Sequence, residues 1–275
     1  MRPMRLEGPA KLNLSLRVVG RRDDGAHLLE SEFVLLDLAD RLLILPGCSG
    51  LRVEGDATPD VPLDGQNLAW RGLRAGLGAE PDLVCLTLEK RIPTAAGLGG
   101  GSSDAAAAWR LGRAANGVDE PATEAELVEL ATIGADVPFF AAGVAAARVG
   151  GIGERVQPLP ATVQHVVLLH PPFGLATSDV FAELRHDEWG SSDNDLLAPA
   201  RRLRPELDEL LARMRDAGGT PRLTGSGPTI FTLADDEQHA AAIAGALARA
   251  SAHTTVTRTR EVPAAIEPID EEEEA

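Results

Sequence analysis

The chain of 275 residues has no tyrosine at all, and aromatic residues make up only 3% of it. No apolar run reaches about 18 residues, so the sequence predicts no membrane-spanning helix. The first residues, 1–6, contain no apolar segment, and we expect no signal peptide. Cysteine is scarce as well: Cys48 and Cys85 are too few for a disulfide framework and lack the spacing of metal ligands. A reducing cytoplasm is therefore the expected location.

The balance of charge excludes another class of function. With 42 acidic and 26 basic residues the net charge is −16, whereas a nucleic-acid-binding protein needs a basic face. Residues 267–274 form an acidic tail that we expect to be disordered and solubilising. Apolar residues make up 44% of the chain, which at this length predicts a sizeable core and two closely joined subdomains.

The most informative segment present is rich in glycine. Residues 92–104 place four glycines and two serines between an apolar run at 83–88 and an alanine-rich helix expected over 103–115. Exposed backbone amides and a helix N-terminus together predict a phosphate-binding loop, with a flexible surface turn as the alternative. The Walker A pattern and the dinucleotide pattern both fail here, because neither a Lys-Ser/Thr pair nor a correctly placed last glycine is present.

Periodicity predicts strands and helices in irregular order, which favours an α+β fold. A new unit is expected to start after the glycines and prolines of residues 150–160. Strands are predicted at 4–19, 28–38, 41–45, 50–54, 83–88, 166–170, 222–223, 229–233 and 254–261. Helices are predicted at 67–77, 103–115, 123–133, 179–184, 195–203, 205–217 and 235–250.

Three isolated polar residues stand out as candidates for chemistry. Of 26 basic residues only Lys11 and Lys90 are lysines, which indicates positions that need a compact, mobile charge, unless they were retained by chance. Asp136 lies within the apolar, proline-bounded stretch 134–140, where a carboxylate needs a structural partner or a task. A cap or turn role remains the alternative for Asp136.

Several segments together resemble the GHMP kinase superfamily, over about residues 8 to 234. Residues 9–14 resemble its N-terminal motif, the glycine-rich segment its second motif and residues 223–228 its third. The string at 97–107 resembles the branch that phosphorylates the 2-hydroxyl of 4-diphosphocytidyl-2-C-methyl-D-erythritol for isoprenoid precursor synthesis. The resemblance thus implies an ATP-dependent small-molecule kinase.

The resemblance also implies a two-subdomain architecture. Residues 1–157 are expected to form the ATP-binding domain, similar to ribosomal protein S5 domain 2. Residues 158–265 are expected to form a ferredoxin-like C-terminal domain, and residues 266–275 the acidic tail. A monomer or weak homodimer is expected, without nucleic acid or membrane partners.

Residue by residue, the resemblance assigns the following roles. Asp136 is the base that takes the proton of the acceptor hydroxyl, and Lys11 stabilises the transferring phosphoryl group. ATP, with Mg²⁺ bridging its phosphates near a serine hydroxyl, is expected to contact Asn67, Lys90, Pro93, Ala96, Gly97, Leu98, Gly99, Gly100, Gly101, Ser102 and Ser103. The cytidine diphosphate substrate is expected to contact Asn13, His27, Thr177, Phe181, Gly225 and Ser226.

One departure from the family pattern concerns the substrate. Ala26 stands where the family carries a tyrosine that stacks on cytosine, beside His27, which hydrogen-bonds the base. This departure favours one alternative, a superfamily kinase that acts on a different alcohol. A non-catalytic ATP sensor is the other alternative, although such a protein would need neither Lys11 nor Asp136.

Overall fold

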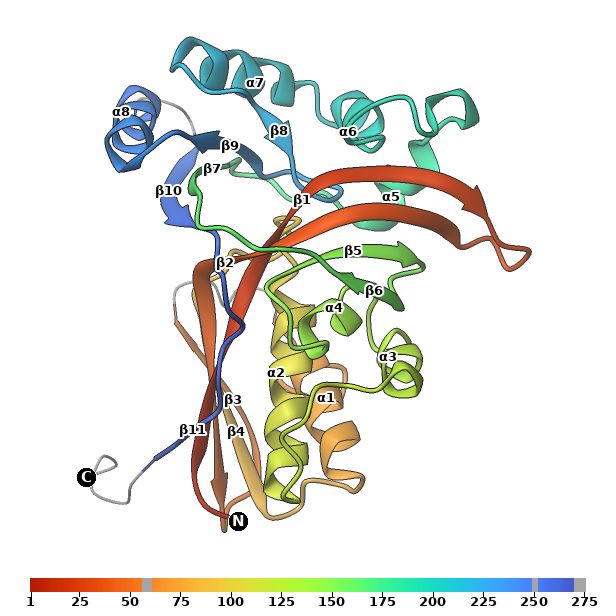
Figure 1. Ribbon diagram of the computed structural model, residues 1–275, viewed down its shortest axis with the longest axis vertical. Helices are drawn as coiled ribbons and strands as arrows, with labels where there is room; N and C mark the ends of the chain where they lie inside the picture. The colour runs from red at the N-terminus through yellow and green to blue at the C-terminus, as the bar shows by residue number, and fades with distance from the viewer. Residues whose placement is uncertain (56–60, 249–251, 270–275) are drawn as a thin grey trace.

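The computed structural model describes residues 1–55, 61–248 and 252–269, which form two sheets with helices on each (Figure 1). The larger sheet has the order β11-β1-β2-β4-β3, and β5 and β6 continue it from β2. β1 and β2 are long antiparallel strands, whereas β3 and β4 pair in parallel. The bounds of its strands are β1 Met4–Arg21, β2 His27–Pro46, β3 Gly50–Gly55, β4 Val84–Lys90, β5 Ala146–Gly151, β6 Arg155–Pro158 and β11 Glu267–Pro268.

Four helices accompany the large sheet: α1 Leu68–Leu77, α2 Gly100–Ala115, α3 Glu124–Leu130 and α4 Val137–Ala141. α1 and α2 run side by side (Figure 1). Their backbones almost touch, since a Cβ on Gly72 would lie 2.0 Å from the carbonyl oxygen of Ala105. The alanine-rich composition of α2 therefore serves close packing, which holds its N-terminus at a fixed place beside the sheet.

The smaller sheet has the order β10-β7-β9-β8. Its strands are β7 His165–His170, β8 Arg222–Leu223, β9 Ile230–Ala234 and β10 His253–Arg258. The helices around it are α5 Thr177–Glu183, the 3₁₀ turn η1 His186–Glu188, α6 Leu197–Leu203, α7 Glu206–Asp216 and α8 Glu237–Leu247. No helix among the described residues is long and apolar enough to cross a membrane.

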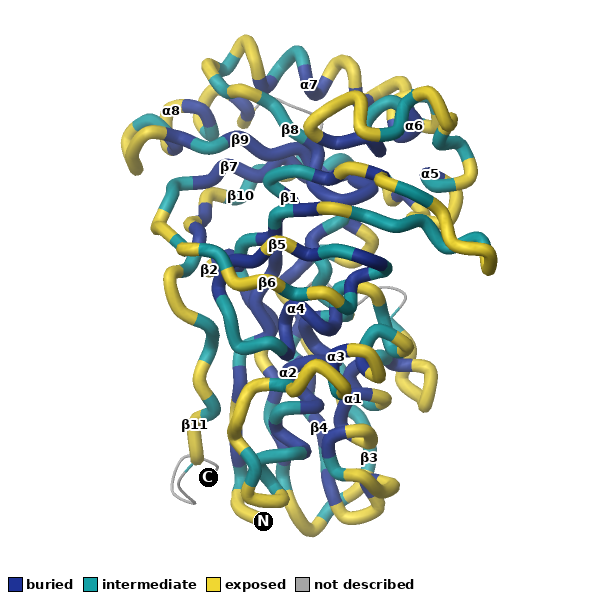
Figure 2. Tube along the Cα trace, turned by 45° about the vertical axis from the view of Figure 1, so that its right-hand side comes forward, coloured by how far each residue is buried: buried dark blue, intermediate teal, exposed yellow. Residues whose placement is uncertain are grey.

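Buried residues join the two halves of the molecule (Figure 2). One core cluster combines Leu12 of β1 and Leu98 of the glycine-rich segment with Leu168 of β7 and Phe231 of β9. In a second cluster, Leu16 of β1 packs among residues of the C-terminal half. Burial of these side chains stabilises the junction by about 1.5–3 kcal/mol each, and the junction carries the site described below.

Most elements lie where periodicity predicted them, with instructive exceptions. The strands expected at 28–38 and 41–45 are one strand, β2, because the acid between them, Asp40, is buried and hydrogen-bonded. α2 begins at Gly100 and not at Ser103. The predicted capping box of α3 at Thr123 and Glu126 is confirmed. α4, β5 and β6 were not predicted, and the end of the helix expected over 235–250 lies outside the described residues.

The acidic tail differs from its prediction at its start. Glu267 and Pro268 form β11, which pairs with β1, and the side chain of Glu267 accepts a hydrogen bond from Arg5 at 2.7 Å. This part of the tail is thus ordered by backbone pairing and one exposed ion pair. Residues 270–275 lie outside the described residues. The division at residues 157 and 158 stays a proposal.

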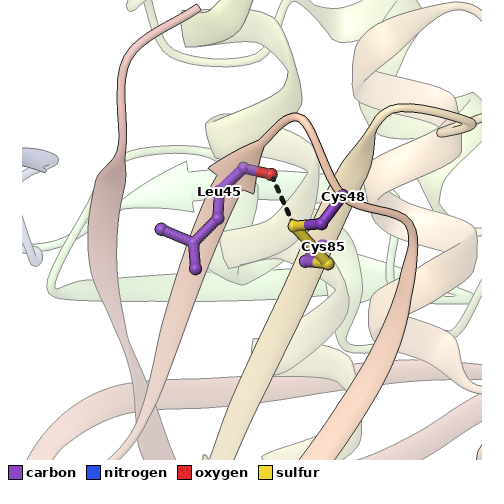
Figure 3. The surroundings of a disulfide bond; sticks show 3 residues. All are labelled: Leu45, Cys48 and Cys85. Carbon is purple, nitrogen blue, oxygen red and sulfur yellow. Dashed lines mark hydrogen bonds between the residues drawn. A yellow bond between two sulfur atoms is a disulfide. The ribbon is translucent and has the colours of Figure 1, made fainter. Parts of the chain in front are cut away.

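Cys48 and Cys85 form a disulfide that the cysteine count did not predict (Figure 3). Their Cα atoms are 5.3 Å apart, and the bridge ties the turn between β2 and β3 to the start of β4. The Cys48 sulfur lies 3.6 Å from the carbonyl oxygen of Leu45.

Candidate active site

A cavity of about 580 Å³ between the glycine-rich segment, β1 and α5 gathers most of the predicted site residues. Its lining includes Lys11, Asn13, Asn67, Lys90, Pro93, Ala96, Gly97, Leu98, Gly99, Gly100, Gly101, Ser102, Asp136, Thr177, Phe181, Gly225 and Ser226. Two predicted residues, His27 and Ser103, are not part of that lining. Segments far apart in sequence therefore meet at one place, as the predicted site requires.

The glycine-rich segment leads into α2 through left-handed backbone. Gly97 and Gly99 have φ values of +75° and +73°, which glycine adopts without strain. A Cβ on Gly97 would lie 2.5 Å from the carbonyl oxygen of Thr224, so this loop touches residues 223–228, the second glycine loop, directly. Gly99 is the N-cap of α2, and the first helical amides, at Gly100 and Gly101, have no intrahelical acceptor. The helix N-terminus thus offers an anion-binding surface to the cavity.

Lys11 and Asp136 form the charged centre of the cavity. The Lys11 Nζ lies 3.5 Å from Asp136 Oδ2, and the lysine side chain is 3% exposed against 30% for the aspartate. Lys11 also donates hydrogen bonds to Asn13 Oδ1 at 2.5 Å and to the carbonyl oxygen of Gly97 at 3.0 Å. A buried cation is thus fixed between the phosphate loop and a carboxylate that ligands can reach.

Asn13 takes part in a network that holds Lys11 in place. Its Oδ1 accepts from Lys11 and from Thr224 Oγ1, and its Nδ2 donates to Ser31 Oγ at 2.9 Å. Ser31 in turn donates to the carbonyl oxygen of Ser15. One N–H of the Asn13 amide remains for a ligand. Ser31 and Thr224 were not predicted, because only the β1–β2 pairing and the second glycine loop bring them there.

Lys90 lies in a buried cluster with two aspartates. Its Nζ donates to Asp104 Oδ2 at 2.7 Å and to Asp40 Oδ2, and all three residues are at most 3% exposed. Burial raises the pKa of Asp104 well above its usual range, against the opposing effect of Lys90. Burial alone would lower the pKa of Lys90, but the charges of Asp104 and Asp40 raise it. The predicted contact of Lys90 with the nucleotide therefore competes with two internal partners.

The other predicted contacts lie on opposite sides of the cavity. Asn67 caps α1, accepting from the Ala69 amide at 2.8 Å. On the α5 side, Thr177 Oγ1 and Ser226 Oγ are hydrogen-bonded at 2.9 Å. Phe181, one turn along α5, stacks on His27 with ring centroids 5.0 Å apart. His27 thus reaches the site through Phe181, and the arrangement separates a nucleotide side from an aromatic side.

Gly153, which also lines the cavity, was not predicted. A Cβ there would lie 1.9 Å from the carbonyl oxygen of Ala135, the residue before Asp136. Gly153→Ala should therefore displace Asp136 and lower kcat about 100-fold. Gly50→Ala is the matched control, since its φ of +121° resembles the +117° of Gly153 but no atom lies within 4 Å of the added Cβ. Equal kcat losses in both variants, measured at saturating substrates, would exclude this positioning role.

Two family models match the chain. The model described as GHMP kinases N terminal domain matches residues 67–144, and that described as GHMP kinases C terminal matches residues 179–253. Together with the glycine-rich segment and the Lys11–Asp136 pair, these matches define the chain as a GHMP kinase, which confirms the expected α+β fold.

Curated relatives narrow the assignment. A 4-diphosphocytidyl-2-C-methyl-D-erythritol kinase of Thermus thermophilus is 40% identical over 87% of this chain and 90% of its own length. That of Paracoccus denitrificans is 40% identical over 82% of this chain and 85% of its own. A crystal structure of 4-(cytidine 5'-diphospho)-2C-methyl-D-erythritol kinase matches with a TM-score of 0.77 and 37% identity, covering 93% and 99% of the two chains. The chain belongs to the 4-diphosphocytidyl-2-C-methyl-D-erythritol kinase family.

More distant structures share the fold alone. A homoserine kinase from Cytophaga hutchinsonii has a TM-score of 0.66 at 16% identity, covering 98% of each chain. The mevalonate kinase of L. major has a TM-score of 0.65 at 17% identity, covering 93% of this chain and 95% of its own. The same architecture therefore serves different alcohols, and the acceptor must be argued from the site.

Proposed function

We propose that this kinase transfers the γ-phosphoryl group of ATP to the 2-hydroxyl of 4-diphosphocytidyl-2-C-methyl-D-erythritol. This reaction is one step of non-mevalonate isoprenoid synthesis. The observation that carries the proposal is the Lys11–Asp136 pair at 3.5 Å, in the cavity that the N-terminus of α2 also lines. The relatives named 4-diphosphocytidyl-2-C-methyl-D-erythritol kinase support the choice of acceptor.

In this mechanism the chain supplies positioning, charge and a proton acceptor. The amides at the start of α2 bind the phosphates, which fixes the donor. Asp136 accepts the proton of the attacking hydroxyl, and Lys11 neutralises the charge that develops on the phosphoryl oxygens. Positioning and charge neutralisation are most of what phosphoryl transfer requires.

Mg²⁺ fits the site if the phosphates supply most of its ligands. No group of three or more acidic, histidine or cysteine side chains that could hold a metal occurs among the described residues. Mg²⁺ commonly uses only one or two protein ligands beside substrate phosphates and water. Ser102 lines the cavity and is the candidate hydroxyl, whereas the Oγ of Ser103 is buried without a hydrogen-bond partner in the described chain. The ion would neutralise phosphate charge there.

A coupled assay of ADP release over several alcohols tests the acceptor. We expect turnover with 4-diphosphocytidyl-2-C-methyl-D-erythritol and none with mevalonate, homoserine or a simple sugar alcohol. Turnover only on another alcohol would move the assignment to a different kinase activity. ATP binding without turnover on any acceptor would make the chain a sensor.

Location and assembly complete the proposal. We propose that the enzyme works in the cytoplasm, where its phosphoryl donor ATP is available. We also propose that the protein is a monomer or a weak homodimer. Sedimentation at micromolar concentration distinguishes these states from a stable higher oligomer.

A further inference from the structure

Four aromatic rings gather at the α5 side of the cavity. His27, at the start of β2, stacks on Phe181 with an interplanar angle of 22°. Trp189 meets the same imidazole edge-on, with centroids 5.7 Å apart and an angle of 79°. The ring centroids of His186 and Trp189 are 4.5 Å apart. His27 thus contacts both Phe181, a ring that lines the cavity, and Trp189, an indole that is not part of the lining.

Trp189 lies outside the helices and strands. It follows η1, and its indole Nε1 is buried without a hydrogen-bond partner in the part of the chain that the structure describes. A tryptophan N–H usually finds a partner when buried, so its position serves the ring contacts at the expense of that hydrogen bond.

Arg202 of α6 fixes the segment that carries Trp189. Its guanidinium donates to the Glu183 side chain at 2.8 Å and to the Glu183 carbonyl oxygen at 2.7 Å. It also donates to both carboxylate oxygens of Glu188, one at 2.5 Å and the other at 2.9 Å. Hydrogen bonds from Arg202 lower the pKa of Glu188 to about 2. This bidentate pairing fixes both ends of the chain from α5 to Trp189.

The protonation state of His27 decides which hydrogen bonds its imidazole can make with a ligand. Burial and the nearby charge of Arg21 lower the pKa of His27, so the imidazole is neutral near pH 7. A neutral imidazole offers one donor and one acceptor, as the edge of a pyrimidine base does. Among the described residues, the charge of Arg21 from β1 acts on His27, and His186 from η1 contacts the Trp189 ring.

We propose that Trp189 is a positioning residue for recognition of the substrate's base, holding His27 against Phe181 where Ala26 provides no ring. The inference rests on the proposed function, since it concerns how that acceptor is bound. Arg202 supports it by fixing the segment from Glu183 to Glu188. The aromatic cluster thus includes a residue from the turn after η1 that does not itself line the cavity.

Steady-state kinetics of Trp189→Ala test the inference. Loss of the edge-to-face contact should raise the KM for the cytidine acceptor about three- to tenfold and leave the KM for ATP and kcat near wild type. Trp189→Phe keeps an aromatic ring and should restore most of the acceptor affinity. Arg202→Met should raise the same KM. Arg201→Met removes an exposed arginine of the same helix, which pairs with Asp208, and is the control that should change neither KM.

The pH dependence separates positioning from a general structural role. Without the indole, His27 is better solvated, so its pKa rises and the acid limb of kcat/KM for the acceptor moves to higher pH in Trp189→Ala. An acceptor KM and acid limb equal to wild type in that variant would overturn the inference, as would an equal rise in the KM for ATP. If Trp189→Ala does not fold, Trp189→Phe and Arg202→Met carry the same comparison. Failure of the proposed function is distinguishable, because wild type itself would then be inactive on the cytidine acceptor.

Discussion

Asp136→Asn is expected to lower kcat by about two to four orders of magnitude while the Kd for ATP stays near wild type. The amide cannot accept the hydroxyl proton, yet it keeps the shape of the side chain and its place 3.5 Å from Lys11. Asp136 is not among the residues that form the phosphate loop, so nucleotide binding has no reason to change. Single-turnover kinetics with saturating acceptor measure the chemical step, and calorimetric titration measures ATP binding.

Asp82→Asn serves as the control for the loss of one negative charge. Asp82 is exposed in the loop before β4 and does not line the cavity. Asp82→Asn should leave kcat and the Kd for ATP unchanged. If Asp136→Asn turned over at the wild-type rate, Asp136 would not be the base, and the proton would leave by another route.

Lys90→Met is expected to have the largest effect on stability. Removing the ammonium leaves Asp40 and Asp104 as two buried carboxyl groups without a cation. Loss of one partner of a buried ion pair costs about 3–5 kcal/mol, which corresponds to a decrease in Tm of roughly 10 °C in a chain of this size. Thermal unfolding with and without ATP separates this effect from any loss of nucleotide binding.

The comparison variant for Lys90→Met is Asp104→Asn. Because burial raises the pKa of Asp104, a neutral amide at this position costs about 1 kcal/mol or less and leaves Lys90 paired with Asp40. Tm values equal for the two variants would contradict this account of the cluster.

The stability of Lys90→Met should also depend on pH. Without Lys90, nothing opposes the effect of burial on Asp104, so its folded-state pKa lies above the unfolded value of about 3.9. The neutral form of Asp104 is tolerated, so the variant is closest to wild type near pH 4 and loses stability as pH rises through the raised pKa of Asp104. A difference in free energy of unfolding that stayed constant between about pH 4 and pH 7 would contradict the buried-charge explanation.

The backbone of the glycine-rich segment could be predicted because its pattern is local. Closely spaced glycines before an alanine-rich helix indicate left-handed turns that lead into the helix, and Gly97 and Gly99 have such a backbone at the start of α2. Lys11 and Asp136 could be singled out by residue type, since a rare lysine and an isolated acid in an apolar stretch need a reason. Their meeting across 125 positions came only from the family resemblance.

What could not be predicted depends on tertiary contacts. Asp40 looks like a strand break until Lys90 and the amides of Arg91 and Ile92 satisfy it, which makes β2 continuous. Gly153 has no local signal, because its requirement arises from the approach of Ala135. Trp189 is placed by a clamp from Arg202, and no periodic pattern predicts such a contact.

With Asp136 as the base and Lys11 beside it, the phosphoryl group is expected to go to the 2-hydroxyl of the cytidine diphosphate acceptor. Phosphorus NMR of the product formed from ATP, Mg²⁺ and 4-diphosphocytidyl-2-C-methyl-D-erythritol shows which oxygen carries the new phosphate. We expect one new phosphomonoester on the 2-oxygen, one ADP for each product molecule and an intact diphosphate, with at most about one hundredth as much product from Asp136→Asn over the same time. ATP hydrolysis without a new ester, or a phosphate on another hydroxyl, would contradict this expectation.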